Sequence, residues 1–172
     1  MISLQTHPMK NRGSQILALV ALASLACLTG CAKRIESSAP TSASRKHEHK
    51  PPHGGTPVVL GKEVYHIEFV LDAADGKLQA YIFDGEMENF IRSALASFEV
   101  NAVVNGAPQS LLFRAVANAA TGETVGDTAL FEAQADWLKS ANEFDGRLKS
   151  ITIRGSTFDE VKFNFPKGND QD

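Results

Sequence analysis

Cysteine is scarce in this chain of 172 residues: Cys27 and Cys31 are its two thiols, and both lie near the N-terminus. The rest of the chain can form neither a disulfide framework nor a cysteine-based zinc site. Long apolar runs are also missing, because the most apolar stretch, residues 16–28, is shorter than the roughly 18 residues that a membrane-spanning helix needs. We therefore expect a fold without covalent cross-links or thiol chemistry.

Motifs of common enzyme classes are missing as well. No Gly-x-Gly-x-x-Gly sequence occurs, and no serine stands in a Gly-x-Ser-x-Gly context. Carboxylates are abundant, but the 18 Asp and Glu of residues 53–172 form neighbouring pairs by chance, so acid pairs alone do not indicate catalysis. We therefore expect a protein that is not an enzyme.

The N-terminus has the pattern of a bacterial lipoprotein. Lys10 and Arg12 precede the apolar run, and Leu28-Thr29-Gly30-Cys31 ends it. This ending resembles the lipobox, whose cysteine is acylated, with palmitate for example, and becomes the first mature residue. The resemblance implies a signal peptide over residues 1–30, a lipid anchor at Cys31, and a periplasm-facing place at the inner or outer membrane of the cell envelope. The alternative is an ordinary signal peptide in which Cys31 is incidental.

Residues 31–52 have the composition of a disordered tether. Positions 37–44 hold only Ser, Ala, Thr and Pro, which cannot bury enough surface to offset the entropy lost on ordering. The tether carries a net charge of +3, whereas residues 53–172 carry −8, with 10 Lys and Arg against 18 Asp and Glu. A basic tether beside a lipid anchor favours anionic headgroups; a solvated spacer is the alternative. The acidic domain repels phosphates, so we expect no nucleic-acid partner.

Residues 53–167 are predicted to form a single β domain, followed by a disordered tail at 168–172. Apolar and polar residues alternate over 65–72 and over 78–84, with the turn Ala73-Ala74-Asp75-Gly76 between them. The resulting hairpin pairs Leu71 with Leu78, Phe69 with Ala80 and Ile67 with Ile82, and on its other face Glu68 with Tyr81 and His66 with Phe83. That other face is half apolar, so we expect it to be partly covered.

Two further hairpins follow from the pattern. Asn105-Gly106 suits a type I′ turn, and pairing across this turn sets Phe98 opposite Phe113. Residues 148–154 and 161–165 form the other hairpin, in which matching the apolar positions requires a bulge.

Short helical turns complete the prediction. A strand over residues 128–134 leads into a helical turn over 135–140, with Trp137 and Leu138 inward, and residues 88–95 form a second turn. Seven or eight short strands, with a turn signal about every ten residues, predict an all-β fold: an antiparallel β-sandwich or a small barrel. The pattern does not favour a helix-rich or doubly wound fold.

Four histidines lie between positions 47 and 66, near the junction of tether and domain: His47, His49, His53 and His66. Glu68 follows His66 on the same face of a predicted strand. Neutral imidazole binds copper and zinc well, and a carboxylate can complete or orient the ligand set. The pattern predicts a metal site with His53 and His66 as ligands, Glu68 as a ligand or as a hydrogen-bond acceptor behind them, and His47 and His49 as a capture arm. The alternatives are solvated tether histidines and a surface histidine on the strand.

A second group of oxygen donors occupies residues 84–89, with the sequence Asp-Gly-Glu-Met-Glu-Asn. Calcium prefers such ligands, but the spacing of a calcium-binding loop is not met. We therefore expect an acidic loop after a strand, in which Met87 packs against its neighbours.

The stretch 53–92 resembles segments of two known groups. It contains His53-Gly54-Gly55-Thr56-Pro57, then His66-Ile67-Glu68-Phe69-Val70-Leu71-Asp72, then Tyr81-Ile82-Phe83-Asp84-Gly85. These are similar to a group of small bacterial lipoproteins of planctomycete type, and to the His-Gly-Gly-led β segment of periplasmic adaptor subunits of heavy-metal efflux pumps. The adaptor resemblance implies periplasmic metal handling through His53, His66 and Glu68. Adaptors also carry coiled-coil, lipoyl-like and barrel domains for which this chain has no room, so it cannot bridge a pump by itself.

These observations together predict a lipid-anchored, non-catalytic β domain that faces the periplasm. Its expected task is to bind a copper or zinc ion as a sensor, carrier or efflux accessory. The competing hypothesis is a structural or protein-interaction module of the envelope, which binds a partner protein at its strand edges by β-augmentation and needs no metal.

Overall fold

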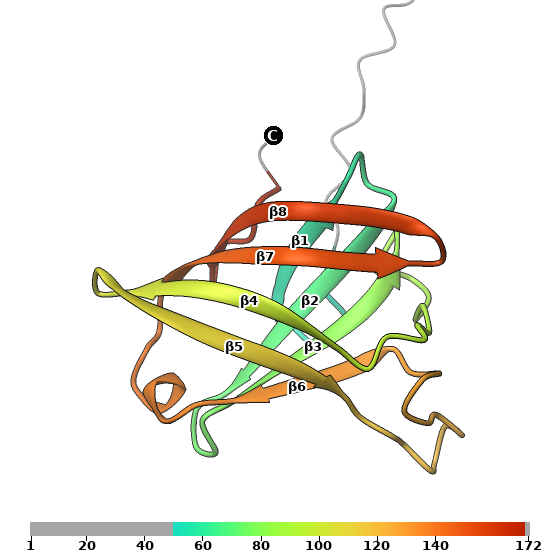
Figure 1. Ribbon diagram of the computed structural model, residues 1–172, viewed down its shortest axis with the longest axis horizontal. Coiled ribbons are helices and arrows are strands. Elements are labelled where there is room, and N and C mark those ends of the chain that lie inside the picture. The colour runs from blue at the N-terminus through green and yellow to red at the C-terminus, as the bar shows by residue number, and fades with distance from the viewer. Residues whose placement is uncertain (1–49, 171–172) are drawn as a thin grey trace, which may run out of the picture. The chain divides into compact units, whose positions relative to one another are not determined.

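The alternating residues form one antiparallel sheet in the computed structural model, which describes residues 50–170. Within this range the strands are β1 Thr56–Leu60, β2 Tyr65–Asp72, β3 Lys77–Asp84, β4 Ser97–Val104, β5 Ala107–Ala115, β6 Leu130–Gln134, β7 Phe144–Ile153 and β8 Ser156–Phe165. Their order across the sheet is β1-β2-β3-β6-β5-β4-β7-β8. The sheet curls into a nearly closed, barrel-like structure (Figure 1). The predicted all-β fold is confirmed.

The first two predicted hairpins have the predicted registers. In β2–β3, Leu71 pairs with Leu78 and Glu68 pairs with Tyr81. In β4–β5, Phe98 pairs with Phe113, and the turn residues Asn105 and Gly106 have φ angles of 50° and 80°. Positive φ at both central residues is what a type I′ turn requires, and Asn and Gly tolerate it best.

The third hairpin, β7–β8, lacks the predicted bulge. Its two-residue turn is Arg154-Gly155, with φ angles of 48° and 87°. The register is the same on both sides of Lys149 and Glu160, the pair missing from the ladder, where Glu160 has a φ of 54°. Two consecutive exposed residues, Lys149 and Ser150, change the buried face instead. Because of this step, Leu148 and Ile151 both enter the core although they are three residues apart.

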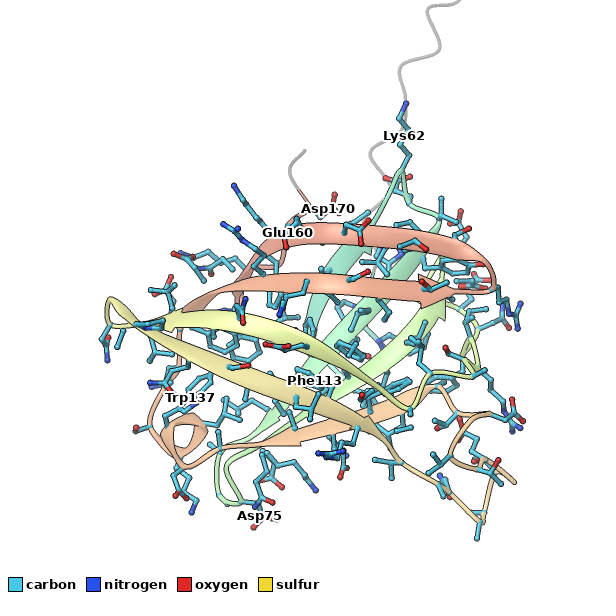
Figure 2. The ribbon with its side chains drawn as sticks, in the orientation of Figure 1. Lys62, Asp75, Phe113, Trp137, Glu160 and Asp170 are labelled. Carbon is cyan, nitrogen blue, oxygen red and sulfur yellow. The ribbon has the colours of Figure 1, made fainter. Side chains whose placement is uncertain are left out.

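Aromatic rings fill much of the interior, and Figure 2 shows side chains gathered inside the curled sheet. Phe69 stacks on Phe163 with ring centroids 4.9 Å apart, and Phe98 stacks on Phe113 at 4.8 Å. Gly146 faces the ring of Phe163, and a Cβ there would come within 2.7 Å of its atoms. The missing side chain at this position therefore makes room for the Phe163 ring.

One of the two predicted helical turns is present. A 3-10 helix, η1, spans Asp136–Lys139; Leu138 in it is fully buried and Trp137 packs against the core. The prediction of a helical turn over residues 88–95 is wrong. This segment is extended, and its Ile91 N–H donates to the Ile82 carbonyl at 2.8 Å. It runs beside the end of β3, where unpaired backbone groups need partners, and a helix would leave those groups unsatisfied.

The two edge strands of the sheet are joined through a side chain rather than through a continuous ladder. The Asn169 amide accepts a hydrogen bond from the Val59 N–H at 2.7 Å and donates to the Val59 carbonyl at 3.1 Å. Thr56 also donates to the carbonyl of Pro166, at 3.1 Å. Asn169, which lies in the predicted tail, thus pairs with β1 as a neighbouring strand does.

Several predicted features lie outside the described residues: the signal peptide, Cys31, most of the tether, and the histidines His47 and His49. Within residues 50–170, no helix is both long enough and apolar enough to cross a membrane.

Candidate functional site

The outward face of β2 carries two buried polar residues. His66 and Glu68 alternate with Ile67 and Phe69, which enter the core, and yet both polar side chains are fully buried. Residues 53–55 and the segment after β3 cover this face. The expectation that the half-apolar face is covered is therefore confirmed.

The Glu68 carboxylate is the centre of this covered region. Its Oε1 accepts hydrogen bonds from the backbone N–H groups of His53, at 2.8 Å, and Gly55, at 2.9 Å. Its Oε2 lies 2.7 Å from Nδ1 of the His53 ring. Because a carboxylate only accepts, Nδ1 carries the proton in this contact. Three donors thus compensate for the burial of the carboxylate, and they fix both the backbone and the imidazole of His53.

Gly55 allows this close approach. A Cβ at position 55 would lie 2.5 Å from the Phe69 carbonyl oxygen and 2.8 Å from a methyl of Val70. No larger residue fits without displacing the segment from β2. Close packing against β2 therefore explains why the second glycine of the His53-Gly54-Gly55 motif, Gly55, has no side chain.

His66 occupies a different environment from His53. Its ring is fully buried, and Nδ1 lies 3.3 Å from the carbonyl oxygen of Asp84. The neighbouring strand places Phe83 opposite it. The structure thus brings His53 and Glu68 into contact, and it places His66 in a buried packing position.

The described part of the chain does not assemble the predicted ligand set. Within residues 50–170, no group of three or more His, Cys, Asp or Glu side chains is arranged to hold a metal ion. Glu68 engages His53 as a hydrogen-bond acceptor, which is one of the two roles predicted for it.

The acidic loop after β3 is organised by Asp84. Its carboxylate accepts hydrogen bonds from the backbone N–H groups of Glu88 and Asn89 and from the Asn89 side chain, the last at 2.7 Å. Burial tends to raise the pKa of Asp84, but these hydrogen bonds outweigh it and lower the pKa. Met87 is almost fully buried, so it packs against its neighbours as predicted.

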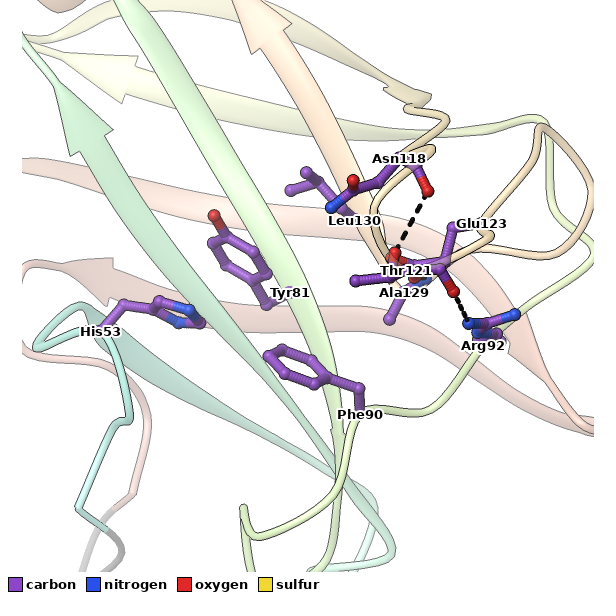
Figure 3. Close-up of a pocket in the computed structure, with 9 residues that line it drawn as sticks. All are labelled: His53, Tyr81, Phe90, Arg92, Asn118, Thr121, Glu123, Ala129 and Leu130. Carbon is purple, nitrogen blue, oxygen red and sulfur yellow. Dashed lines mark hydrogen bonds between the residues drawn. The ribbon is translucent and has the colours of Figure 1, made fainter.

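An aromatic cluster lies beside the His53–Glu68 contact. The His53 ring stacks on Tyr81 with centroids 4.1 Å apart and an interplanar angle of 18°. Phe90 lies 6.0 Å from His53 and 6.1 Å from Tyr81, measured between ring centroids. These three rings form one wall of a cleft of about 440 Å³ on the outer face of β3 and β6 (Figure 3). We call it the His53 cleft; it is lined by His53, Tyr81, Phe90, Arg92, Asn118, Thr121, Glu123, Ala129 and Leu130.

The opposite wall is the loop between β5 and β6. Arg92 holds this loop, donating to the Thr121 carbonyl at 2.7 Å and to the Asp127 carboxylate at 3.1 Å. Glu123 accepts hydrogen bonds from the Thr121 hydroxyl at 2.6 Å and from the Ala129 N–H at 2.8 Å. The pKa of Glu123 is lowered because these bonds outweigh the effect of burial. The polar groups of this wall are thus largely bonded to one another.

Negative charge prevails around the cleft. Four carboxylates line it or lie beside its walls, and three cations accompany them: Glu68, Glu123, Asp127 and Glu132, with Arg92, Lys77 and Arg114. The pKa of Tyr81 is raised, first by burial of the side chain and then by the negative charges of Glu132 and Glu68.

The predicted site residues did not include Tyr81, Phe90 or Arg92. The predicted hairpin places Tyr81 opposite Glu68 on the half-apolar face. This pairing was the one sequence feature that could have indicated Tyr81 as a site residue. Phe90 and Arg92 fall in the segment predicted as a helical turn, and each contacts a residue far away in the sequence: Phe90 contacts His53, and Arg92 contacts Asp127.

Comparison of the chain with models of protein families, with curated proteins and with solved structures finds no match.

Proposed function

We propose that this chain is a lipid-anchored protein of the bacterial cell envelope whose β domain is a non-catalytic binding module for a transition-metal cation. Cys31 carries the lipid, and copper or zinc binds at His53. The module acts as a sensor, carrier or efflux accessory on the periplasmic side of a membrane. The adaptor-like segment 53–92 supports the same assignment by resemblance.

The observation that carries this proposal is the contact between His53 and Glu68. A buried carboxylate that accepts a hydrogen bond from one ring nitrogen fixes the tautomer and the orientation of an imidazole. The other nitrogen, Nε2, then presents a lone pair in a fixed direction. No described residue forms a hydrogen bond with Nε2, and the His53 side chain is 35% exposed.

One imidazole does not complete a metal site, and the tether supplies the other ligands in this proposal. His47 and His49 precede His53 by six and four residues. At up to about 3.5 Å per residue, this spacing lets the tether fold back and bring both imidazoles to the same ion. His66 has a packing role in this arrangement rather than that of a ligand.

The test is a titration of the mature full-length protein in detergent with zinc and copper against a competing chelator. We expect His53→Ala and the double change of His47 and His49 to Ala to weaken binding at least tenfold. Glu68→Gln, which removes only the supporting acceptor, should weaken it about ten- to a hundredfold. Lys50→Ala is the matched control, because it alters the tether without removing a ligand. Affinity that is unchanged in all three variants would refute the metal proposal.

The anchor is tested separately. Cells that express the full chain are labelled with a radioactive fatty acid, and the wild type is compared with Cys31→Ala. We expect label and membrane association in the wild type, and the loss of both in the variant. Unlabelled protein that keeps its first 30 residues would contradict the anchor.

A second candidate function is a partner-binding module of the envelope that needs no metal. It is supported by the partial pairing of β5, which within residues 50–170 pairs with β6 at Arg114 and Ala115 only. An extended segment of a partner protein can add to such an edge by β-augmentation. A charge in the unpaired part of the edge, Leu112→Lys, should abolish in-membrane cross-linking to a partner while leaving metal binding unchanged.

A further inference from the structure

The aromatic wall of the His53 cleft exposes more apolar surface than a packing role requires. Phe90 is 53% exposed, although it contacts Phe83 with ring centroids 4.6 Å apart. Figure 3 shows the rings of Tyr81 and Phe90 on one side of the cleft and the polar loop residues on the other. An exposed aromatic ring beside a cleft is a common feature of ligand sites.

The polar wall restricts what can bind. The Glu123 carboxylate, the Arg92 guanidinium and the Thr121 hydroxyl already hydrogen-bond within the wall. A ligand with several N–H or O–H donors would find few unengaged acceptors, and each unmet donor would weaken binding. The cleft therefore favours a group without hydrogen-bond donors.

The charge around the cleft restricts the ligand further. The four carboxylates of the region exceed its three cations by one when His53 is neutral. A negative field attracts a cation and repels an anion.

We propose that the His53 cleft binds a trimethylammonium group, held by cation–π contacts with Tyr81 and Phe90. Such a group is a cation, it is apolar at its surface, and it has no hydrogen-bond donor. This proposal concerns an organic cation beside His53 and is independent of metal binding at the imidazole.

Ring geometry agrees with this ligand. The Tyr81 and Phe90 centroids are 6.1 Å apart and the rings are inclined at 49°. A cation above both rings can therefore lie within the distance of about 6 Å at which such contacts form. Stacking on His53 fixes the orientation of the Tyr81 ring and covers one of its two faces.

The experiment uses the full-length protein in a maltoside detergent with a chelator present, so that bound metal contributes nothing. Choline chloride is titrated by NMR and compared with 3,3-dimethylbutan-1-ol, its uncharged carbon analogue. We expect choline to bind at least five times more tightly. Phe90→Leu should weaken choline binding about two- to fivefold, the range for an exposed cation–π contact. Leu112→Ala, a change at an exposed apolar residue on β5, is the matched control and should have no effect.

A third variant preserves the aromatic rings and changes only the charge. Glu132→Gln should weaken choline binding without affecting the neutral analogue. Equal binding of choline and its analogue, or choline binding that Phe90→Leu and Glu132→Gln leave unchanged, would overturn the proposal. Vesicles of phosphatidylcholine and of phosphatidylglycerol identify the source: selective binding to the former assigns the group to a lipid headgroup, and binding of free choline alone assigns it to a solute.

Discussion

Replacing His53 with Ala and Glu68 with Gln, separately and together, measures how much their contact stabilises the domain. His53→Ala removes the ring donor and leaves the two backbone donors on Oε1. Glu68→Gln keeps the size of the side chain but replaces one acceptor oxygen with an NH₂ group. With the amide oxygen on the two backbone donors, the NH₂ group meets Nδ1 of His53, which accepts only after the ring proton moves to Nε2. The variant therefore loses the hydrogen bonds to a charged acceptor and the tautomer that leaves a lone pair on Nε2.

The magnitude follows from burial and charge. A hydrogen bond to an ionised group contributes about 1.5–3 kcal/mol, and an unmet buried donor costs about 1–3 kcal/mol. The Glu68 side chain is fully buried, but the His53 side chain is 35% exposed, so water replaces part of the ring contact. We expect the free energy of unfolding to fall by about 1–2 kcal/mol for His53→Ala and by about 2–3 kcal/mol for Glu68→Gln. The coupling energy of the double-mutant cycle should be about 1–2 kcal/mol.

The assay is urea unfolding followed by the fluorescence of Trp137, the one Trp of the chain. Lys149 and Glu99 provide a matched control cycle, because their 3.2 Å contact joins two exposed side chains. An exposed pair of this kind contributes little to stability, because water and salt screen the two charges. If the His53–Glu68 coupling is no larger than the control coupling, the carboxylate does not fix the imidazole and the reasoning fails.

Three further predictions concern the fold. Gly146→Ala should lower the free energy of unfolding by about 1–3 kcal/mol, because the new methyl overlaps the Phe163 ring; an unchanged urea midpoint would show that the ring moves at no cost. Asn169→Ala should cost about 1–3 kcal/mol and speed hydrogen exchange at the Val59 amide, and exchange at the wild-type rate would contradict the joining of the sheet edges through Asn169. Because the folded-state pKa of Asp84 is lowered, this carboxylate stabilises the fold above its unfolded-state pKa, and that contribution is lost as the pH falls through the folded value. The wild type should therefore be more stable than Asp84→Asn by a constant amount near neutral pH, and this difference should shrink below about pH 4. A difference that grows as the pH falls would contradict the lowered pKa of Asp84.

The hairpins were predictable because their determinants are local. Asn105-Gly106 specifies its own turn, and the alternation around Ile67 and Ile82 leaves one register that buries all the apolar residues. The same logic failed for β7–β8. In β7 the alternation of buried and exposed residues is interrupted by two consecutive exposed residues, Lys149 and Ser150. The sequence pattern does not distinguish such an interruption from a bulge.

The candidate site was predictable only in part. His53 and Glu68 were identified by residue type and spacing, and the structure places them in contact. His66 was identified in the same way, but it lies in a buried environment of its own. Residue type indicates which side chains can do chemistry, and it does not indicate which of them meet.

The sequence by itself determined the strands other than β1, the registers of the β2–β3 and β4–β5 hairpins and the residues capable of chemistry, because each depends mainly on nearby positions in the chain. Tertiary structure alone decided that residues 53–55 cover β2 and that Asn169 joins the sheet edges. It also decided that Arg92 holds the loop opposite Tyr81 and so forms the second wall of the His53 cleft. Curling of the sheet brings Asn169 to Val59, 110 residues away in the chain. The other two contacts arise where neighbouring strands pair, β1 with β2 and β3 with β6.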